Sequence, residues 1–478
     1  MIKRGSVFFL SVSILLSAFI TGDNASIARL KNEVSKLKKD PDLLHGIFGV
    51  YVLDIKKDSV LFDYNGSIGL VPASSQKTLT TAAALCLFGE DYKFETRIEY
   101  DGVLDSSKGI LKGNIYIHGS GDPSLGSKYF KDEKDTTELV EKWAKLISLK
   151  GIKRIEGAVI ADASVFDDEM VPSTWIWGDM GNYYGAGACG LTYKDNLYTV
   201  FFKTGGVGDS ARISRVEPYI PGMTIINKVK AGGSSDNCYI YGAPYGNVRT
   251  ATGMVPPGKT DFDVNGSVPD PAWFCAWSLD TALKTYGVQI TQKPTSVREL
   301  KLAKQYSSST RKTLFSEFSP PLSQIVYWTN KRSINLYAEC LLKAISVKQK
   351  NYGGEETGTN ALTEFWQSKG MDVGGMHLND GCGLSRWNSV TPKQFATLMK
   401  LMTKENCFKS FYASLPEQVS GVVAKSGYIG RVRSYAGYAK KKNGDLIAFS
   451  LIANNYDCSP GEMRVKFEKL MEVIAAME

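Results

Sequence analysis

Apolar and polar residues follow several different patterns along this chain. After an apolar run over residues 7–20, apolar positions recur at helical spacing over 27–37, which predicts an amphipathic helix. Two β-rich runs then flank residues 56–58 and predict a hairpin. A further apolar stretch over 82–88 predicts a buried helix, which Gly89 would close with a left-handed cap.

Between about residue 93 and residue 300 the pattern changes to short strands separated by Gly, Asp, Asn and Pro, which predicts an all-β insert. Helical patterns return afterwards, and the last of them begins with Thr391 as N-cap and Pro392 in the first turn. The chain ends with strands, a hairpin at Asn443-Gly444 and a helix. The whole pattern predicts an α/β frame that the insert interrupts.

The composition is that of a globular chain and excludes several classes of function. Apolar residues make up 43% of the 478 residues and charged residues 22%, so a large core can form. The net charge of +8 is spread without basic blocks, which argues against a nucleic-acid partner. His45, His118 and His377 have neither metal-ligand spacing nor a GxSxG neighbour, so we expect neither a zinc hydrolase nor a Ser-His-Asp triad.

The amino terminus predicts an exported protein. Lys3 and Arg4 precede the apolar run, which is too short for a comfortable membrane span and has the layout of a secretory signal. We therefore expect residues 1–22 to be a signal peptide and the mature protein to be periplasmic or secreted, with an uncleaved anchor as the alternative. The 8 cysteines are too sparse for a disulfide scaffold, and we predict no pairing.

One SxxK motif differs from the others by its context. Ser74 and Lys77 stand where the buried helix is expected to begin, and positions i and i+3 share a helical face, so the amine can act as base for the hydroxyl. A helix amino terminus also favours a developing alkoxide. The same spacing occurs in an exposed charged helix and in a polar run, at Ser35/Lys38 and Ser309/Lys312.

The usual partners of an SxxK serine are an SxN and a K[ST]G motif, and the chain offers two candidates for each. The literal KTG and SDN, at 203–205 and 235–237, lie in the β-rich insert in reversed order. We favour the other pair because it has the required order and setting. Ser333 and Asn335 open a helix, and Lys425 is expected to end a strand that another strand follows.

Four segments occur in this order along the chain: PASSQK, KRSINLYAE, NDGCGLSRWNSVTP and AKSGYIGRVRSYAGY. Together they resemble the class C low-molecular-mass, or type 4, penicillin-binding proteins, a family of D-alanyl-D-alanine carboxypeptidases and endopeptidases. The insert is also similar to that family, through SGDPSL at 120–125 and IEGAVIADASVF at 155–166. The likeness runs from about residue 27 to the carboxyl terminus.

The resemblance implies an α/β (α+β) penicillin-recognising DD-transpeptidase/β-lactamase-like domain with a large β-rich nested insert. The stretch between Lys77 and Ser333 is too long for a simple class A β-lactamase and fits such an insertion. The expected parts are a discontinuous catalytic domain, a discontinuous inserted domain and a nested domain, with the limits 26–92 and 298–478, 93–190 and 262–297, and 191–261.

The resemblance also implies roles for individual residues. Ser74 would form an acyl-enzyme, and Lys77 would be its base, with a pKa lowered by burial and by the charge of Lys425. Ser333 would relay a proton to the leaving amine, and Asn335 would hold the substrate amide. Other residues would bind the terminal carboxylate, form the oxyanion hole or read the stem-peptide diamino acid in a side pocket: Ser426, Gly427, Tyr428, Asp179, Tyr184 and Arg386. A polar residue is frequent in that pocket where this chain has Gly430.

We therefore expect a serine DD-peptidase that acts on peptidoglycan stem peptides without a metal or organic cofactor, with β-lactams as inhibitors and no nucleic-acid partner. Peripheral membrane association, oligomeric state and the balance of carboxypeptidase and endopeptidase activity are left open. Two alternatives remain. One is a β-lactamase, because Glu356 and Asn360 mimic a deacylating loop, and the other is a catalytically silent wall-binding module.

Overall fold

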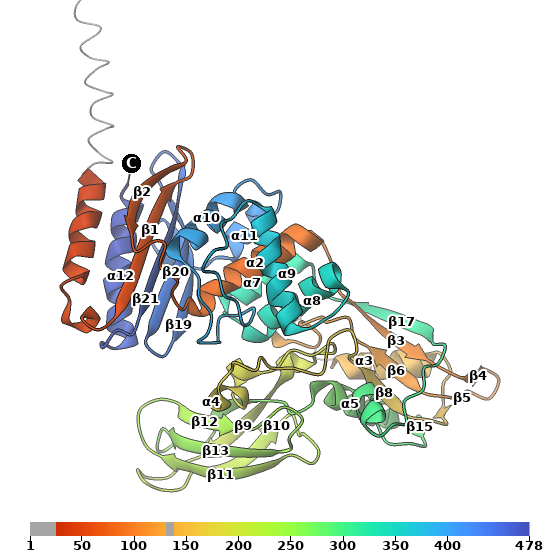
Figure 1. Ribbon diagram of the computed structural model, residues 1–478. Helices are drawn as coiled ribbons and strands as arrows, with labels where there is room; N and C mark the ends of the chain where they lie inside the picture. The colour runs from red at the N-terminus through yellow and green to blue at the C-terminus, as the bar shows by residue number, and fades with distance from the viewer. Residues whose placement is uncertain (1–24, 131–137, 478) are drawn as a thin grey trace, which may run out of the picture. The chain divides into compact units, whose positions relative to one another are not determined.

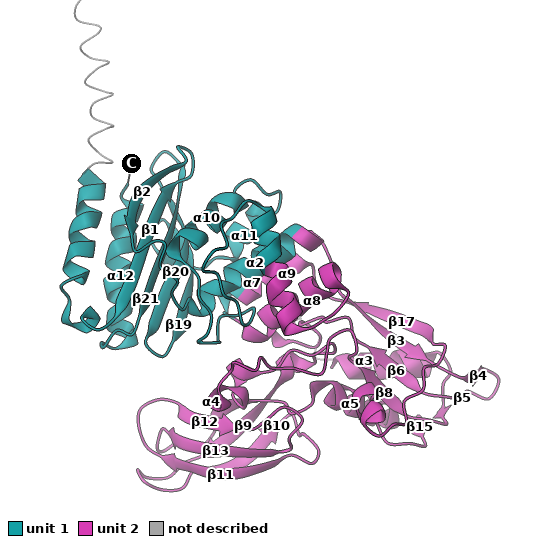
Figure 2. Cartoon of the chain, viewed as in Figure 1, with its two compact units in different colours: residues 1–86, 330–333, 363–478 teal, residues 87–329, 334–362 magenta. Residues whose placement is uncertain are grey.

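The computed structural model describes residues 25–130 and 138–477. The chain divides into two compact units, which Figure 2 shows in separate colours. Each unit combines segments that are far apart in the sequence: the first comprises 1–86, 330–333 and 363–478, and the second 87–329 and 334–362. The domain limits expected from the sequence stay a prediction, because this division does not separate a nested domain from the rest of the insert.

The first unit is built around a six-stranded antiparallel sheet with the order β18-β19-β20-β21-β1-β2 (Figure 1). Its strands are β1 Ile47–Asp54, β2 Ser59–Tyr64, β18 Glu417–Val419, β19 Val422–Ile429, β20 Val432–Lys440 and β21 Leu446–Asn454. Both predicted hairpins are confirmed, since β1 pairs with β2 around 56–58 and β20 pairs with β21 around Asn443-Gly444. The strand nearest the amino terminus, β1, pairs along its whole length with β21, which comes near the end of the chain.

Helices cover both faces of this sheet, because its central strands are buried on both sides. The helix over 25–37 and α12 (Pro460–Ala475) share one apolar cluster with the sheet. On the other face α10 (Pro392–Met402) packs against β1, β20 and β21, with α2 (Lys77–Phe88) and α11 (Phe408–Ser414) beside it (Figure 1). The predicted Thr391 cap of α10 is confirmed, because its hydroxyl accepts from the backbone of the first turn.

The second unit contains a five-stranded sheet, β16-β8-β6-β3-β17, and a four-stranded sheet, β15-β7-β5-β4. Their strands are β3 Glu95–Tyr100, β4 Val103–Asp105, β5 Ile110–Lys112, β6 Ile115–His118, β7 Arg154–Ile155, β8 Val159–Asp162, β15 Gln289–Ile290, β16 Thr295–Ser296 and β17 Lys312–Phe318. Parallel pairs such as β6 with β8 need crossover connections, which helices supply here.

The prediction of an all-β insert is therefore wrong. The insert contains α3 (Leu139–Leu149), α5 (Pro271–Thr285) and α6 (Val297–Leu302). Helix α3 buries Val140, Trp143, Ala144 and Ile147, which is a helical spacing. This spacing is present in the sequence, but strand and turn signals on both sides of it are stronger, so the pattern predicts no helix here.

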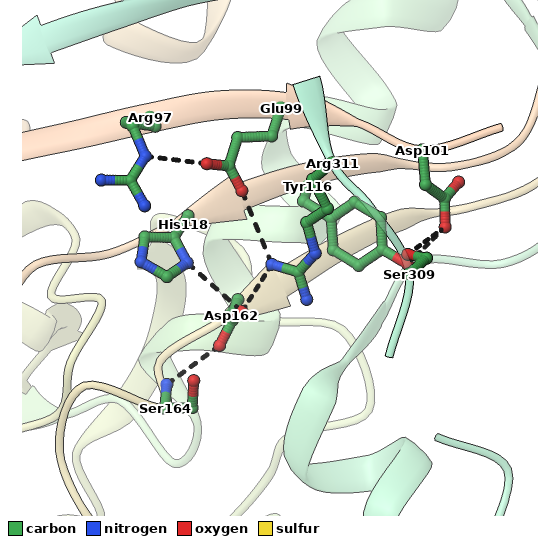
Figure 3. Close-up of polar contacts among 9 residues, drawn as sticks. All are labelled: Arg97, Glu99, Asp101, Tyr116, His118, Asp162, Ser164, Ser309 and Arg311. Carbon is green, nitrogen blue, oxygen red and sulfur yellow. Dashed lines mark hydrogen bonds and ion pairs between the residues drawn. The ribbon is translucent and has the colours of Figure 1, made fainter. Parts of the chain in front are cut away.

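A polar network crosses the five-stranded sheet (Figure 3). The carboxylate of Asp162 accepts from Arg311 at 2.6 Å and from the backbone N–H of Ser164 at 3.1 Å, and lies 3.3 Å from His118 Nδ1. Burial by itself would raise the pKa of Asp162, but these hydrogen bonds outweigh burial and hold the pKa below its ordinary value. Arg311 also stacks on Tyr116, 3.8 Å from the ring centre. The segment that leads back from α6 is thus tied to the sheet by buried charge.

Two small sheets form the middle of the second unit. The first has the order β10-β9-β14 and the second β11-β13-β12. Their strands are β9 Leu197–Lys203, β10 Arg212–Glu217, β11 Thr224–Ala231, β12 Asn237–Tyr241, β13 Val248–Val255 and β14 Phe262–Ser267. Their inner faces share one apolar cluster with α3 and α5. Short helical turns complete the described chain: η1 Pro41–Leu43, η2 Ala73–Gln76, η3 Lys128–Phe130, α4 Trp177–Met180, η4 Tyr183–Gly185 and η5 Lys194–Asn196.

Three longer helices follow the insert: α7 Leu322–Lys331, α8 Asn335–Lys350 and α9 Glu355–Ser368. Glu356 and Asn360, whose spacing mimics a deacylating loop, instead lie in the first turns of α9. Two carboxylates, Glu355 and Glu356, suit a helix amino terminus, which explains the difference. Among the described helices, none is both long and apolar enough to cross a bilayer. The expected signal peptide, residues 1–22, lies outside the described residues.

Candidate active site

Ser74 lies in η2, a single turn that leads directly into the buried helix α2. The backbone before it is strained, because Ala73 has φ +46°, a left-handed conformation that alanine rarely adopts. Such strain persists only where the surroundings hold it, and it occurs often at functional sites. The helix ends as predicted, since α2 stops at Phe88 and Gly89 follows with φ +87°.

Lys77 is fully buried at the first position of α2. Its Nζ donates to Ser74 Oγ at 3.0 Å and to the carbonyl of Cys382 at 2.8 Å. The predicted meeting of this hydroxyl and this amine on one helical face is therefore present in the structure. A buried amine within hydrogen-bond reach of a serine hydroxyl can serve as its base.

Lys425 brings a second buried amine to the same place. Its side chain is 2% exposed, and its Nζ donates to the carbonyl of Ser426 at 2.7 Å. Burial, followed by the nearby charge of Lys77, holds the pKa of Lys425 well below its ordinary value. Two buried amines so close together cannot both stay charged without cost, so the pair gives up one proton more readily than an isolated lysine does.

Gly427 explains how the strand comes so close to Ser74. A Cβ added at Gly427 would stand 2.7 Å from the carbonyl oxygen of Pro72 and 2.8 Å from the backbone nitrogen of Ser74. Strand β19 runs through the whole tripeptide to Ile429, so the expectation that Lys425 ends a strand is wrong. Pairing with β20 continues without a register shift past Gly427, so an unbroken strand carries the tripeptide along Ser74.

Two groups that the sequence analysis missed hold this geometry. The hydroxyl of Ser434, on β20, bonds the carbonyl of Pro72 and the hydroxyl of Ser75. On the other side, the Gln76 amide donates to the Asp380 carbonyl and to its carboxylate at 3.0 Å. Asp380 precedes the Cys382 carbonyl that meets Lys77, and its carboxylate accepts from the backbone N–H groups of the same loop. In the sequence, the one local indication of this contact is that Gln76, a polar residue, directly precedes Lys77 in the expected buried helix.

Ser333 belongs to the first compact unit, with Ser74, Lys77 and Lys425. It has φ +56°, another left-handed non-glycine residue, and the N-cap of α8 is Ile334 rather than Ser333. Just before it, the Asn330 amide donates to Thr81 Oγ1 at 3.1 Å. This bond holds the segment before Ser333 against α2, one turn beyond Lys77.

The remaining predicted residues form two further groups. In the second unit Asn335 donates to the backbone carbonyl of Tyr184 at 2.7 Å. Burial first, and then the charge of Asp179, raise the pKa of the Tyr184 hydroxyl. In the first unit Arg386 is exposed, and its guanidinium lies 4.0 Å from the position that a Cβ of Gly430 would take. Tyr428, near the end of β19, is half exposed.

Two of the motifs that we did not assign to the active site, the SxxK at Ser309 and the KTG at 203–205, make structural contacts. The hydroxyl of Ser309 donates to Asp101 at 2.9 Å, next to Arg311 in the polar network (Figure 3). The hydroxyl of Thr204, in the literal KTG, donates to the carbonyl of Pro256 at 2.8 Å. Lys203 beside it is exposed at the end of β9. Both tripeptides of the rejected pair belong to the second unit.

Comparisons with known proteins agree along nearly the whole chain. The family model described as D-Ala-D-Ala carboxypeptidase 3 (S13) matches residues 30–476. A D-alanyl-D-alanine carboxypeptidase of Actinomadura sp. (strain R39) is 25% identical, over 94% of this chain and 85% of that protein. D-alanyl-D-alanine carboxypeptidase DacB of Haemophilus influenzae is 24% identical, over 97% and 96%.

A solved structure shows the same fold. The crystal structure of penicillin binding protein 4 (dacB) from Haemophilus influenzae matches with a TM-score of 0.77 at 23% identity, over 92% of this chain and 97% of that chain. The predicted fold, a penicillin-recognising domain with a large β-rich insert, is thereby confirmed.

Proposed function

This chain belongs to the D-Ala-D-Ala carboxypeptidase 3 (S13) family and is a serine-type D-alanyl-D-alanine peptidase, and we propose that it hydrolyses peptidoglycan stem peptides with Ser74 as nucleophile. One observation carries the assignment of the nucleophile. The buried Lys77 amine lies 3.0 Å from Ser74 Oγ, beside a second buried amine, Lys425. A hydroxyl that shares a buried site with two lysines is set up for proton removal without histidine or metal.

The proposed first half-reaction is acyl transfer. Ser74 Oγ attacks the carbonyl carbon that precedes the terminal D-alanine, while its proton passes to Lys77. The oxyanion that forms is bound by the backbone N–H groups of Ser74 and Tyr428, and one such donor contributes about 10²- to 10³-fold. The C–N bond then breaks as the leaving amine takes up a proton, which Ser333 relays from Lys77. The product is an ester between Ser74 and the shortened peptide.

The second half-reaction is hydrolysis of this ester by water, with the neutral amine as general base. During both steps Lys425 and the hydroxyl of Ser426 hold the terminal carboxylate, whose negative charge favours the protonated form of Lys425 once the substrate is bound. Asn335 holds an amide of the substrate. No step needs a bound metal or an organic cofactor.

The proposed specificity for the diamino acid of the stem peptide is carried over from the roles of matching residues in the family. We assign Asp179, Tyr184 and Arg386 to recognition of the diamino acid in the stem peptide. An acidic residue suits the free amine of that side chain, and arginine suits its carboxylate. Asp179→Asn should slow release of D-alanine from a stem peptide with a free side-chain amine, and should leave unchanged the rate on a matched peptide with alanine at that position.

Export to the periplasm is proposed on the apolar run over 7–20, because the polymer that this family's substrates belong to lies outside the cytoplasm. Mass analysis of the protein recovered from the periplasmic fraction tests this. Loss of residues 1–22 supports a cleaved signal, and a full-length chain in the membrane fraction supports the anchor.

Labelling with a fluorescent penicillin tests the proposed chemistry. We expect a long-lived covalent label on Ser74 that disappears in Ser74→Ala and persists in Ser309→Ala, the matched decoy serine. Rapid turnover of the label would indicate a β-lactamase, and complete absence of label would indicate a silent wall-binding module. Digestion of cross-linked and uncross-linked muropeptides, read by mass, then gives the balance of endopeptidase and carboxypeptidase activity.

A further inference from the structure

The three-stranded sheet β11-β13-β12 has one face in the core of the second unit and the other in solvent. Side chains alternate between the faces of a strand, and Val229, Ala251 and Ile240 are buried. Their neighbours in sequence therefore point outward. Read across β11, β13 and β12, the outward rows are Ile226/Thr250/Tyr241, Lys228/Thr252/Tyr239 and Lys230/Met254/Asn237.

This outward face carries large apolar and aromatic side chains among polar ones. Ile226 is 45% exposed, Tyr239 48% and Met254 47%, one on each strand. Each of these side chains lies in a different row, so apolar and aromatic groups alternate with polar ones across the face. The rows also offer hydroxyl, amide and ammonium donors, and their outward positions hold lysines and no carboxylate.

The face continues towards the residues assigned to the diamino acid. The backbone N–H of Ile240 donates to Asn182 Oδ1 at 2.9 Å, so the segment from α4 to η4 lies along the edge of β12. This segment carries Asp179 and Tyr184. At its start the Trp177 ring, 53% exposed, lies 6.3 Å from the ring of Tyr241. Within the second unit, an aromatic row thus joins the sheet to the segment that carries Asp179 and Tyr184.

We propose that this face binds the glycan strand of peptidoglycan, which presents the stem peptides to be cut. The inference rests on the proposed function, since it takes the polymer as substrate. Flat aromatic rings with a polar edge stack on the apolar faces of sugars, while Thr and Asn side chains bond their hydroxyl and N-acyl groups. The strand carries carboxylates on its lactyl groups or stem peptides, and Lys228 and Lys230 complement that charge.

The test separates polymer binding from catalysis. Tyr239→Ala and Lys228→Ala alter one outward row, and Tyr286→Ala, an exposed tyrosine 41% accessible at the end of α5, is the matched control. The readouts are co-sedimentation with intact sacculi, fluorescence anisotropy with glycan strands freed of stem peptides by an amidase, and the rate of penicillin labelling.

We expect Tyr239→Ala to weaken binding to sacculi and to stripped strands about tenfold. Lys228→Ala should weaken it less, with a loss that fades at high salt. The penicillin labelling rate should stay unchanged in both variants, and Tyr286→Ala should match the wild type throughout.

Three outcomes would overturn the inference. The first is unchanged binding in Tyr239→Ala. The second is wild-type binding to sacculi but not to stripped strands, which would assign recognition to the peptides. The third is a change from dimer to monomer in light scattering with unchanged sedimentation, which would assign the face to a second copy of the chain. Absence of penicillin label in the wild type would instead overturn the proposed function, whatever the binding results.

Discussion

Lys425 and Lys203 stand in nearly the same tripeptide, Lys-Ser-Gly and Lys-Thr-Gly, yet their surroundings are opposite. Lys425 is buried in the middle of β19 near Lys77, and Gly427 of the same tripeptide lies against the backbone of Ser74. Lys203 is exposed at the end of β9, and the Thr204 hydroxyl after it bonds the Pro256 carbonyl. The difference shows that the same tripeptide can stand in opposite surroundings, and we propose that it supports acyl transfer only where burial and a second functional group act on the same amine.

Removing each lysine tests this contrast most severely. Lys425→Ala should lower the rate of penicillin labelling about 10³-fold, because it removes both the charge that holds the carboxylate and the neighbour of Lys77. Lys203→Ala should leave the rate within twofold of the wild type. Stopped-flow labelling gives both rates. A large loss in Lys203→Ala would exchange the roles of the two tripeptides.

The two motif glycines give a second, smaller contrast. Gly427→Ala should slow labelling about 10²-fold, because its methyl group meets backbone atoms of Pro72 and Ser74, which can move only with the nucleophile. At Gly205 the nearest atom is a carboxylate oxygen of Asp209, at the end of a side chain that can rotate away. Gly205→Ala should therefore label normally. Equal effects of the two substitutions on the labelling rate would show that the close approach at Gly427 has no special role in labelling.

The pH dependence of labelling sharpens the contrast further. Burial and the Lys77 charge lower the pKa of Lys425 from its ordinary value of 10.5, so the pair loses its first proton at a lower pH than an isolated lysine. The labelling rate should rise with pH as the pair loses this first proton. In Lys425→Ala the acid limb should move up by roughly one pH unit, since one like charge is gone. Lys203→Ala should keep the wild-type profile, and an unshifted limb in Lys425→Ala would contradict electrostatic coupling.

The smallest expected effect is on the pH dependence of the unfolding free energy. Between the lowered pKa of Lys425 and 10.5, the unfolded chain binds a proton on this side chain that the folded protein lacks, so its contribution to stability rises with pH. Lys425→Met should remove up to about 1.4 kcal/mol per pH unit from the slope of the unfolding free energy in that window. Urea unfolding at several pH values measures it, with Lys203→Met as the control without a change in slope. A slope that survives in Lys425→Met would mean that Lys425 stays charged in the fold.

Much of the first unit was predictable because its signals are local. A glycine or Asn-Gly pair between strands, a threonine cap before a proline, and a lysine three positions after a serine each act within one turn of backbone. Those predictions, at Gly444, Thr391 and Ser74/Lys77, describe contacts that the structure contains. The family and its fold followed from the order of such segments.

Other features were not predictable because their partners are distant in sequence. Nothing near Ser434 indicates that its hydroxyl bonds the turn at Pro72, 362 positions away. Similarly, the contact of Gln76 with Asp380 spans 304 positions. The helices α3 and α5 were missed because periodicity over a short window competes with strong strand and turn signals on both sides.

The sequence by itself determined the local geometry of Ser74 and Lys77, the hairpins, and the class of enzyme, because each depends on residues within a few positions of one another or on the order of short motifs. Only the tertiary structure decided which lysine of the two tripeptides lies beside Ser74, and which face of the β11-β13-β12 sheet stays in solvent. Both depend on burial, and burial is set by how distant segments pack together, since an amine changes its pKa and a tyrosine becomes a binding surface only through neighbours that the chain brings from elsewhere.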